Sequence, residues 1–119
     1  MSIQLKRAYD PLSESDGLRI LVERLWPRGV KKSDLKLDEW VKDIAPSTAL
    51  RKWYNHVPEK WPEFQRRYRE ELNASPDTID AFVATIHNQT VTFIYAAKDE
   101  KRNSACVLKG YLETQYNIE

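Results

Sequence analysis

The segment Ile20-Leu-Val-Glu-Arg-Leu-Trp-Pro-Arg-Gly29 decides the fold that the sequence predicts. The apolar run from Leu18 to Val22 lies between a glycine and a proline, which is typical of a short buried strand. Arg24, Trp26 and Arg28 follow this strand directly. The residue before a proline is held in an extended conformation, so we expect an extended exit loop with two cations and one aromatic ring.

Two further segments predict strands. Thr90-Val-Thr-Phe-Ile-Tyr-Ala-Ala97 is rich in β-branched and aromatic residues, as buried strands are. Ile3 to Ala8 alternates apolar and polar residues, which predicts a strand with one wetter face. The loop before Leu18 is longer than a tight hairpin and shorter than a usual parallel crossover, so the direction of the first strand stays open.

The remaining segments carry helix signals. They predict an amphipathic piece from Ser33 to Ile44 and a helix from Thr48 to about Asn55 that is capped by Ser47. A third helix begins near Pro58 or at Pro62 and carries the apolar stripe Trp61, Phe64, Tyr68 and Leu72. A fourth helix follows the Ser75-Pro76 cap and carries Ile79, Phe82, Val83 and Ile86, and Asn103 caps a last helix. Helices between two strands indicate a crossover. We therefore expect an α/β fold with a small, mostly parallel sheet of about three strands.

Composition limits the function classes. The 119 residues are enough for one domain, and we take residues 1–119 as a single α/β domain. A hydrophobic fraction of 41% with 31% charged residues is ordinary for a globular protein. The net charge of +1 gives no bulk electrostatic reason to expect binding to nucleic acid or to a membrane. Any cationic site must come from local clustering.

The single cysteine, Cys106, excludes an intramolecular disulfide. No ligand set for a metal and no cofactor motif is present, so we predict neither. No apolar run reaches the length of a signal peptide or a membrane span, and the cytoplasm is the expected location.

The exits of two buried strands define the candidate site. Parallel strands end at the same rim of a sheet, where α/β proteins habitually bind ligands. Free N–H groups at the start of the last helix add a partial positive charge that suits an anion. We therefore predict a pocket for a small phosphate- or carboxylate-bearing ligand, with Asp99 as a general acid/base or as a partner that orients an arginine, and with ligand contacts from Arg24, Trp26, Arg28, Gly29, Lys98, Asn103 and Ser104.

An equally weighted alternative is structural. Arg24 and Asp99 would then form an ion pair between two loops, and Trp26 would plug one end of the core. His56 is either a helix-capping histidine, which we favour, or a catalytic one. Cys106 is interpreted as a buried, inert thiol.

Two rival functions follow from other residues. Basic and aromatic side chains that would form a nucleic-acid-binding surface are Arg51, Lys52, Arg66, Arg67 and Arg69 with Trp53, Tyr54, Trp61 and Tyr68. We rank this second, because Trp61 and Tyr68 share an apolar stripe and glutamates dilute the basic face. A protein-interaction domain or homodimer is the third reading, and the sequence leaves the oligomeric state open.

Several motifs resemble a known family. Val22-Glu-Arg-Leu-Trp-Pro-Arg-Gly29, Leu50-Arg-Lys-Trp53 and Tyr95-Ala-Ala-Lys-Asp-Glu100 with Asn103 resemble the YeaO-like family of small bacterial proteins, a domain-of-unknown-function group. The resemblance implies a compact, cytoplasmic, bacterial α/β domain and brings no established activity that could be carried over, so whether the protein is an enzyme stays open. The resemblance also implies that longer members of the wider group carry cysteines and a histidine flanking the Lys-Asp loop, where this sequence has Tyr95, Asn103 and Ser104. This departure weakens the expectation of thiol or metal chemistry at that loop.

Overall fold

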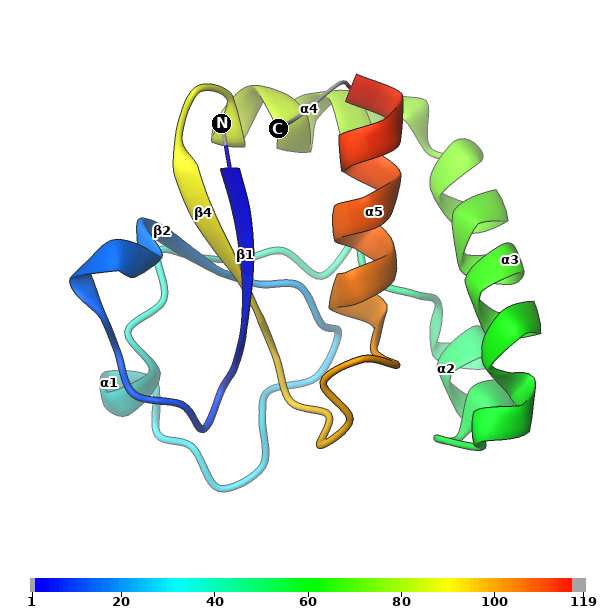
Figure 1. Cartoon of the computed structure of the whole chain (residues 1–119), viewed down its shortest axis with the longest axis horizontal. Coiled ribbons are helices and arrows are strands. Elements are labelled where there is room, and N and C mark those ends of the chain that lie inside the picture. Colours follow the sequence, from blue (N-terminus) through cyan, green and yellow to red (C-terminus); the bar gives the residue numbers. More distant parts are fainter. Residues whose placement is uncertain (1, 117–119) are drawn as a thin grey trace.

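Four parallel strands form the sheet of the computed structural model, which describes residues 2–116. They are β1 (Ser2–Arg7), β2 (Leu18–Leu21), β3 (Glu39–Trp40) and β4 (Thr90–Tyr95), in the spatial order β1-β4-β2-β3 (Figure 1). The α/β prediction is confirmed, with one strand more than expected. The first strand, whose direction the sequence left open, pairs in parallel with β4.

The additional strand corrects one prediction. The amphipathic piece expected from Ser33 to Ile44 is helical only in α1 (Lys32–Leu35), and the chain then runs extended through β3. The backbone N–H groups of Asp38 and Val41 donate to carbonyls of β2 at 2.8 and 2.9 Å. Pairing with an open strand edge outweighs the weak preference of such a short segment for a helix.

The other helices lie close to the predicted segments. They are α2 (Thr48–Tyr54), α3 (Trp61–Asn73), α4 (Pro76–Ile86) and α5 (Ser104–Tyr116), with single 3₁₀ turns at Glu14–Asp16 and Pro58–Lys60. The Ser47 hydroxyl accepts a hydrogen bond from the Leu50 N–H, and the Asn103 side chain accepts one from the Cys106 N–H, so both predicted caps are confirmed. Ser75 precedes α4 without a capping bond from its side chain.

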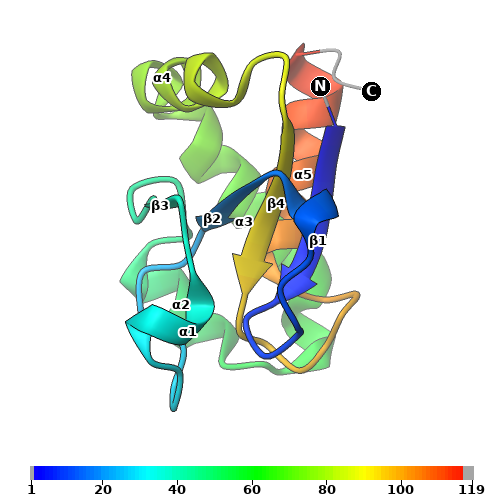
Figure 2. The same cartoon turned by 90° about the vertical axis from the view of Figure 1, so that its left-hand side faces the viewer.

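The sheet separates two apolar clusters of unequal size. Side chains alternate along parallel strands, so Ile20 and Phe93 point into the main core while Leu21 and Ile94 point to the other side. α5 packs against β1 and β4 with α3 beyond it (Figure 1), and α1 lies on the opposite side of the sheet (Figure 2). No helix among the described residues is long and apolar enough to cross a membrane.

A buried ion pair lies on the α1 side. Asp16 accepts hydrogen bonds from Arg19 at 2.5 Å and from Lys6 at 2.7 Å. Burial by itself raises the pKa of Asp16, but the hydrogen bonds from Lys6, Ser13 and Arg19 outweigh it and hold that pKa below its usual value. Arg19 also donates to the Leu35 carbonyl at 2.9 Å, which ties α1 to the sheet.

Gly17, just before β2, and Gly29, in the loop after it, provide a matched test of packing. Both have positive φ, at +64° and +78°. A Cβ at Gly17 would lie 2.1 Å from the Thr90 carbonyl oxygen, whereas nothing lies within 4 Å of one at Gly29. We expect Gly29→Ala to cost only left-handed strain, about 1–2 kcal/mol, and Gly17→Ala to cost clearly more. Urea unfolding measures both, and equal losses would contradict the close approach of Gly17 to β4.

Candidate functional site

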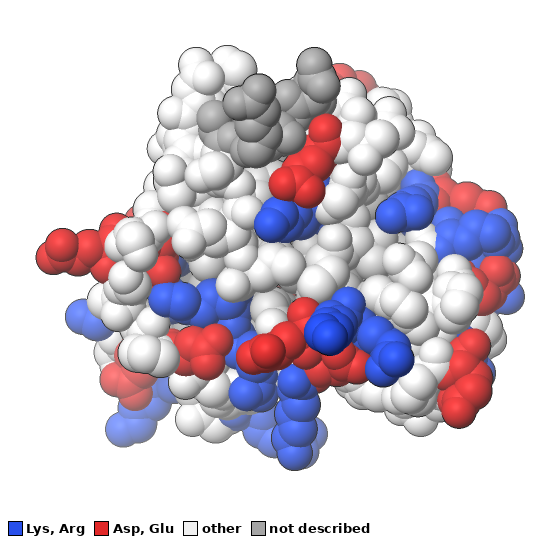
Figure 3. All heavy atoms as spheres, viewed as in Figure 1, with Lys and Arg blue, Asp and Glu red and all other residues white. Residues whose placement is uncertain are grey.

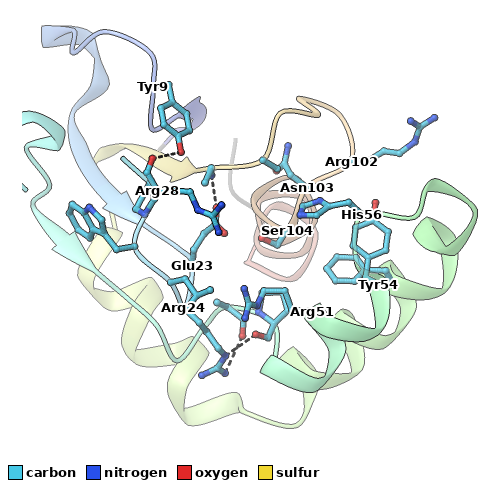
Figure 4. Close-up of a pocket in the computed structure, with 18 residues that line it drawn as sticks. Tyr9, Glu23, Arg24, Arg28, Arg51, Tyr54, His56, Arg102, Asn103 and Ser104 are labelled. Atoms are coloured by element: carbon cyan, nitrogen blue, oxygen red, sulfur yellow. Dashed lines mark hydrogen bonds between the residues drawn. The ribbon is translucent and has the colours of Figure 1, made fainter. Parts of the chain in front are cut away.

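A cavity of about 370 Å³ opens at the rim where the parallel strands end. Its walls come from the loops that follow β1, β2 and β4, from α2 and the segment just before it, and from the start of α5. Six of the predicted site residues line it, namely Arg24, Trp26, Arg28, His56, Asn103 and Ser104. Figure 4 shows Glu23 and Arg51 near its middle, with Arg28 on one side and His56 and Asn103 on the other.

Three predicted residues do not line this cavity: Gly29, Lys98 and Asp99. The Asp99 carboxylate accepts hydrogen bonds from the backbone N–H groups of Arg102 and Lys101, both at 2.9 Å. These bonds, that from Arg102 first, lower the pKa of Asp99. The carboxylate is therefore held by N–H groups of its own loop, and Asp99 does not line the cavity.

Arg24 and Asp99 do not pair. The Arg24 guanidinium donates to the carbonyls of Pro46 at 2.7 Å and Ala45 at 3.3 Å, just before α2. It therefore joins the β2 exit to the segment that leads into α2. Hydrogen bonds of charged donors are worth about 1.5–3 kcal/mol each, so this contact also stabilises the cavity wall.

Trp26 belongs to both the cavity and the smaller core. Its indole N–H donates to the Val30 carbonyl at 2.6 Å, and its ring meets the edge of Trp40 with centroids 5.3 Å apart. The ring packs against the smaller core, as the structural alternative predicts, and also forms a wall of the cavity.

Two guanidinium groups at the cavity have no internal partner. Within residues 2–116, no hydrogen bond or ion pair of Arg28 or Arg51 side chains is present, and the Nε of Arg51 is the one buried side-chain nitrogen or oxygen without a partner. A buried, unpaired donor costs roughly 1–3 kcal/mol. Arg28 is exposed at the cavity mouth, where its carbonyl accepts a hydrogen bond from the Tyr9 hydroxyl at 2.9 Å.

Glu23 supplies a carboxylate to the same cavity. One oxygen accepts a hydrogen bond from the Ala96 N–H at 2.5 Å, where β4 ends. Burial raises the pKa of Glu23, and the Ala96 N–H and the charges of Arg51 and His56 offset this only in part. Glu23 was not among the predicted site residues, although its place at the strand end beside Arg24 is the signal that would have found it.

The N-terminus of α5 closes the side opposite β2. Asn103 is buried, and its amide donates to the Asp99 carbonyl at 3.0 Å while its oxygen caps the helix. Ser104 follows in the first turn and lines the cavity. The Cys106 thiol does not line the cavity and is half-buried rather than buried as expected. It donates to the Glu100 carbonyl, and partial burial raises its pKa.

His56 lies on the side of the cavity away from Arg28 (Figure 4), in an unusual backbone conformation. Its φ is +56°, directly after Asn55, which ends α2 in the left-handed region at φ +46°. The Asn55 N–H, bonded to the Arg51 carbonyl, provides the C-terminal cap. The His56 ring lies 6.1 Å from that of Tyr54, and no hydrogen bond of its imidazole is present within the described chain.

A family model described as the inactive DUF488-N3 subclade matches residues 2–119. The chain belongs to this family. It is 45% identical over 114 residues to the uncharacterized protein YeaO of Escherichia coli, covering 96% of this chain and 99% of that protein. The uncharacterized protein Rv3073c of Mycobacterium tuberculosis is 40% identical over 110 residues, with 92% of each chain covered.

These matches confirm the resemblance to the YeaO-like family. No solved structure matches the chain. Within the described residues of this DUF488-N3 member, no group of three or more His, Cys, Asp or Glu side chains gathers as a metal site.

The residues of the predicted nucleic-acid surface are mostly engaged within the protein. Tyr68 is 1% exposed and donates to the Ile44 carbonyl, and Arg66 and Arg67 both pair with Glu63. On the face in Figure 3, basic and acidic side chains are interspersed rather than separated. Of the five basic residues assigned to this surface, Arg66 and Arg67 thus have a carboxylate partner, whereas Lys52 and Arg69 have no ion pair within the described residues.

Glu23 gives a test of how the rim is held. When folding raises the pKa of a carboxyl, the free energy of unfolding of the protein falls as the pH rises from the unfolded pKa of that group, about 4.3, through its folded pKa. Glu23→Gln removes this loss and keeps an oxygen for the Ala96 N–H, so its Tm at pH 7 should equal or exceed that of the wild type. Glu23→Ala leaves that N–H unpaired and should lower Tm. Calorimetry from pH 4 to 8 compares them. Equal destabilisation by Gln and Ala would show that the charge itself holds the rim.

Proposed function

We propose that the rim cavity binds a small phosphate- or carboxylate-bearing ligand through Arg28 and Arg51. The observation that carries this proposal is the presence of two guanidinium groups in one cavity, neither with a hydrogen-bond partner among the described residues. The N-terminus of α5 faces them from the other wall. A ligand anion would satisfy both arginines and the free N–H groups of the first helical turn.

The energetics favour an anion over a neutral ligand. Guanidinium groups bind carboxylate and phosphate through two parallel N–H donors. At an effective dielectric constant of 20, two unit charges 4 Å apart interact by about 4 kcal/mol, against about 1 kcal/mol in bulk water. The residues that line the cavity include four arginines and one carboxylate, Glu23, so the sum of their formal charges is positive. The arginines are Arg24, Arg28, Arg51 and Arg102.

Binding rather than catalysis is the proposed activity. Asp99 does not line the cavity, and among residues 2–116 the His56 imidazole has no hydrogen-bond partner that would fix its tautomer. The description of the subclade as inactive supports the same choice. A nucleic-acid-binding module is the alternative, and steep salt dependence of a shift with DNA would favour it. We propose a cytoplasmic location on composition alone.

Titration calorimetry with inorganic phosphate tests the proposal. Arg28→Ala and Arg51→Met each remove one guanidinium, whose hydrogen bonds to an oxyanion are worth about 1.5–3 kcal/mol, so each should weaken binding roughly tenfold or more. Arg69→Ala removes an exposed arginine of α3 that does not line the cavity, and should bind like the wild type. Thermal melts confirm that the variants fold. Equal affinity in all four proteins would refute the proposal.

A further inference from the structure

The Glu23 carboxylate has one committed oxygen and one that faces the cavity. Oε1 accepts the hydrogen bond from the Ala96 N–H. Oε2 accepts no hydrogen bond within residues 2–116. Among these residues, Arg51 Nε is the only buried side-chain nitrogen or oxygen without a partner, so the unpartnered Oε2 is not buried. Because Glu23 lines the cavity, Oε2 is open to it. The cavity therefore contains a hydrogen-bond acceptor among its arginines.

No direct ion pair neutralises this acceptor. Arg51 and His56 lie near enough to influence the Glu23 charge, yet neither forms an ion pair with its carboxylate, with nitrogen and oxygen within 4.0 Å, in the described chain. A fully ionised oxyanion held by the arginines would face Oε2 with like charge and without a hydrogen bond. An anion that presents an O–H or N–H to Oε2 replaces this repulsion by a charge-assisted hydrogen bond.

We propose, on the basis of the anion-binding function above, that Glu23 determines specificity: the cavity selects anions that carry a hydrogen-bond donor beside the charged group. The O–H of hydrogenphosphate or of a singly ionised phosphomonoester meets this requirement, and so does the ammonium group of an α-amino acid. Sulfate and simple carboxylates do not. The Glu23 carboxylate, which repels anions without a donor, also links the exits of β2 and β4 through its hydrogen bond from the Ala96 N–H.

The rest of the cavity indicates that the ligand has an apolar body. Its volume, about 370 Å³, lies within the range of roughly 300–1,000 Å³ typical of small organic ligands. Trp26, Tyr54 and Phe64 form apolar walls. Tyr9 and Leu25 are 47% and 57% exposed at the mouth, where an organic group would cover them.

Two matched pairs of probes isolate the donor. Phosphate and sulfate share size and shape, and only phosphate carries O–H at pH 7. L-Phenylalanine and 3-phenylpropionate share a carboxylate and a ring, and only the amino acid carries ammonium. Calorimetry should show that the wild type prefers the donor-bearing member of at least one pair by about tenfold or more. Preference in the first pair identifies a phosphoryl donor, and preference in the second an ammonium donor.

Glu23→Gln tests the residue itself. With its oxygen on the Ala96 N–H, the Gln amide turns its NH₂ donor toward the cavity, so the preference should collapse chiefly through tighter binding of the donor-free anion. Asp77→Asn neutralises an exposed carboxylate at the start of α4, at the other end of the molecule (Figure 1), and should keep the wild-type preference.

The outcomes separate this inference from the proposed function. Equal affinities within both pairs, with binding still lost in Arg28→Ala, would overturn the selectivity and leave anion binding intact. A wild-type preference that Glu23→Gln retains would overturn the assignment to Glu23. Absence of binding by all four probes would overturn both.

Discussion

The parallel pairing of β4 with both β1 and β2 is the constraint on which the rim cavity depends. Leu21 lies opposite Ile94, and the Val22 N–H continues the ladder to the Ile94 carbonyl at 3.3 Å. Beyond Val22 the backbone pairing between β2 and β4 ends. The Glu23 side chain then links the two exits, because it accepts a hydrogen bond from the Ala96 N–H. Because all three strands end at one rim, segments distant in sequence become neighbours: the β2 exit, the β4 exit and the start of α5.

The charged residues at this rim divide into structural and unpaired groups. Arg24 is held by two carbonyls before α2, and Asp99 turns its own loop, so both stabilise the walls. Arg28 and Arg51 have no such partners in the described chain. Natural proteins retain unsatisfied or electrostatically unfavourable groups where function requires them, and the buried Nε of Arg51 together with the raised pKa of Glu23 fits this rule.

The sequence predicted the features whose signals are local. Buried strands appear as apolar runs, and the caps at Ser47 and Asn103 appear as single residues, so the α/β sheet and its helices were found. β3 was missed because a two-residue edge strand has no periodicity of its own. Arg51 was assigned to a basic helical surface, since helical spacing alone does not show that the β2 exit loop and the start of α5 close around it. Asp99 was expected in the site, but its nearest donors are the N–H groups of its own loop.

NMR of the arginine Nε–Hε groups during a phosphate titration tests the central claim most directly. If the cavity binds anions, the Arg28 and Arg51 signals will shift together and saturate, and the Arg51 signal will move most because its buried Nε gains a partner. The signal of Arg66, which is already held by Glu63 and Glu70, will stay in place. Unmoved Arg28 and Arg51 signals, or equal small shifts in every arginine, would contradict the account.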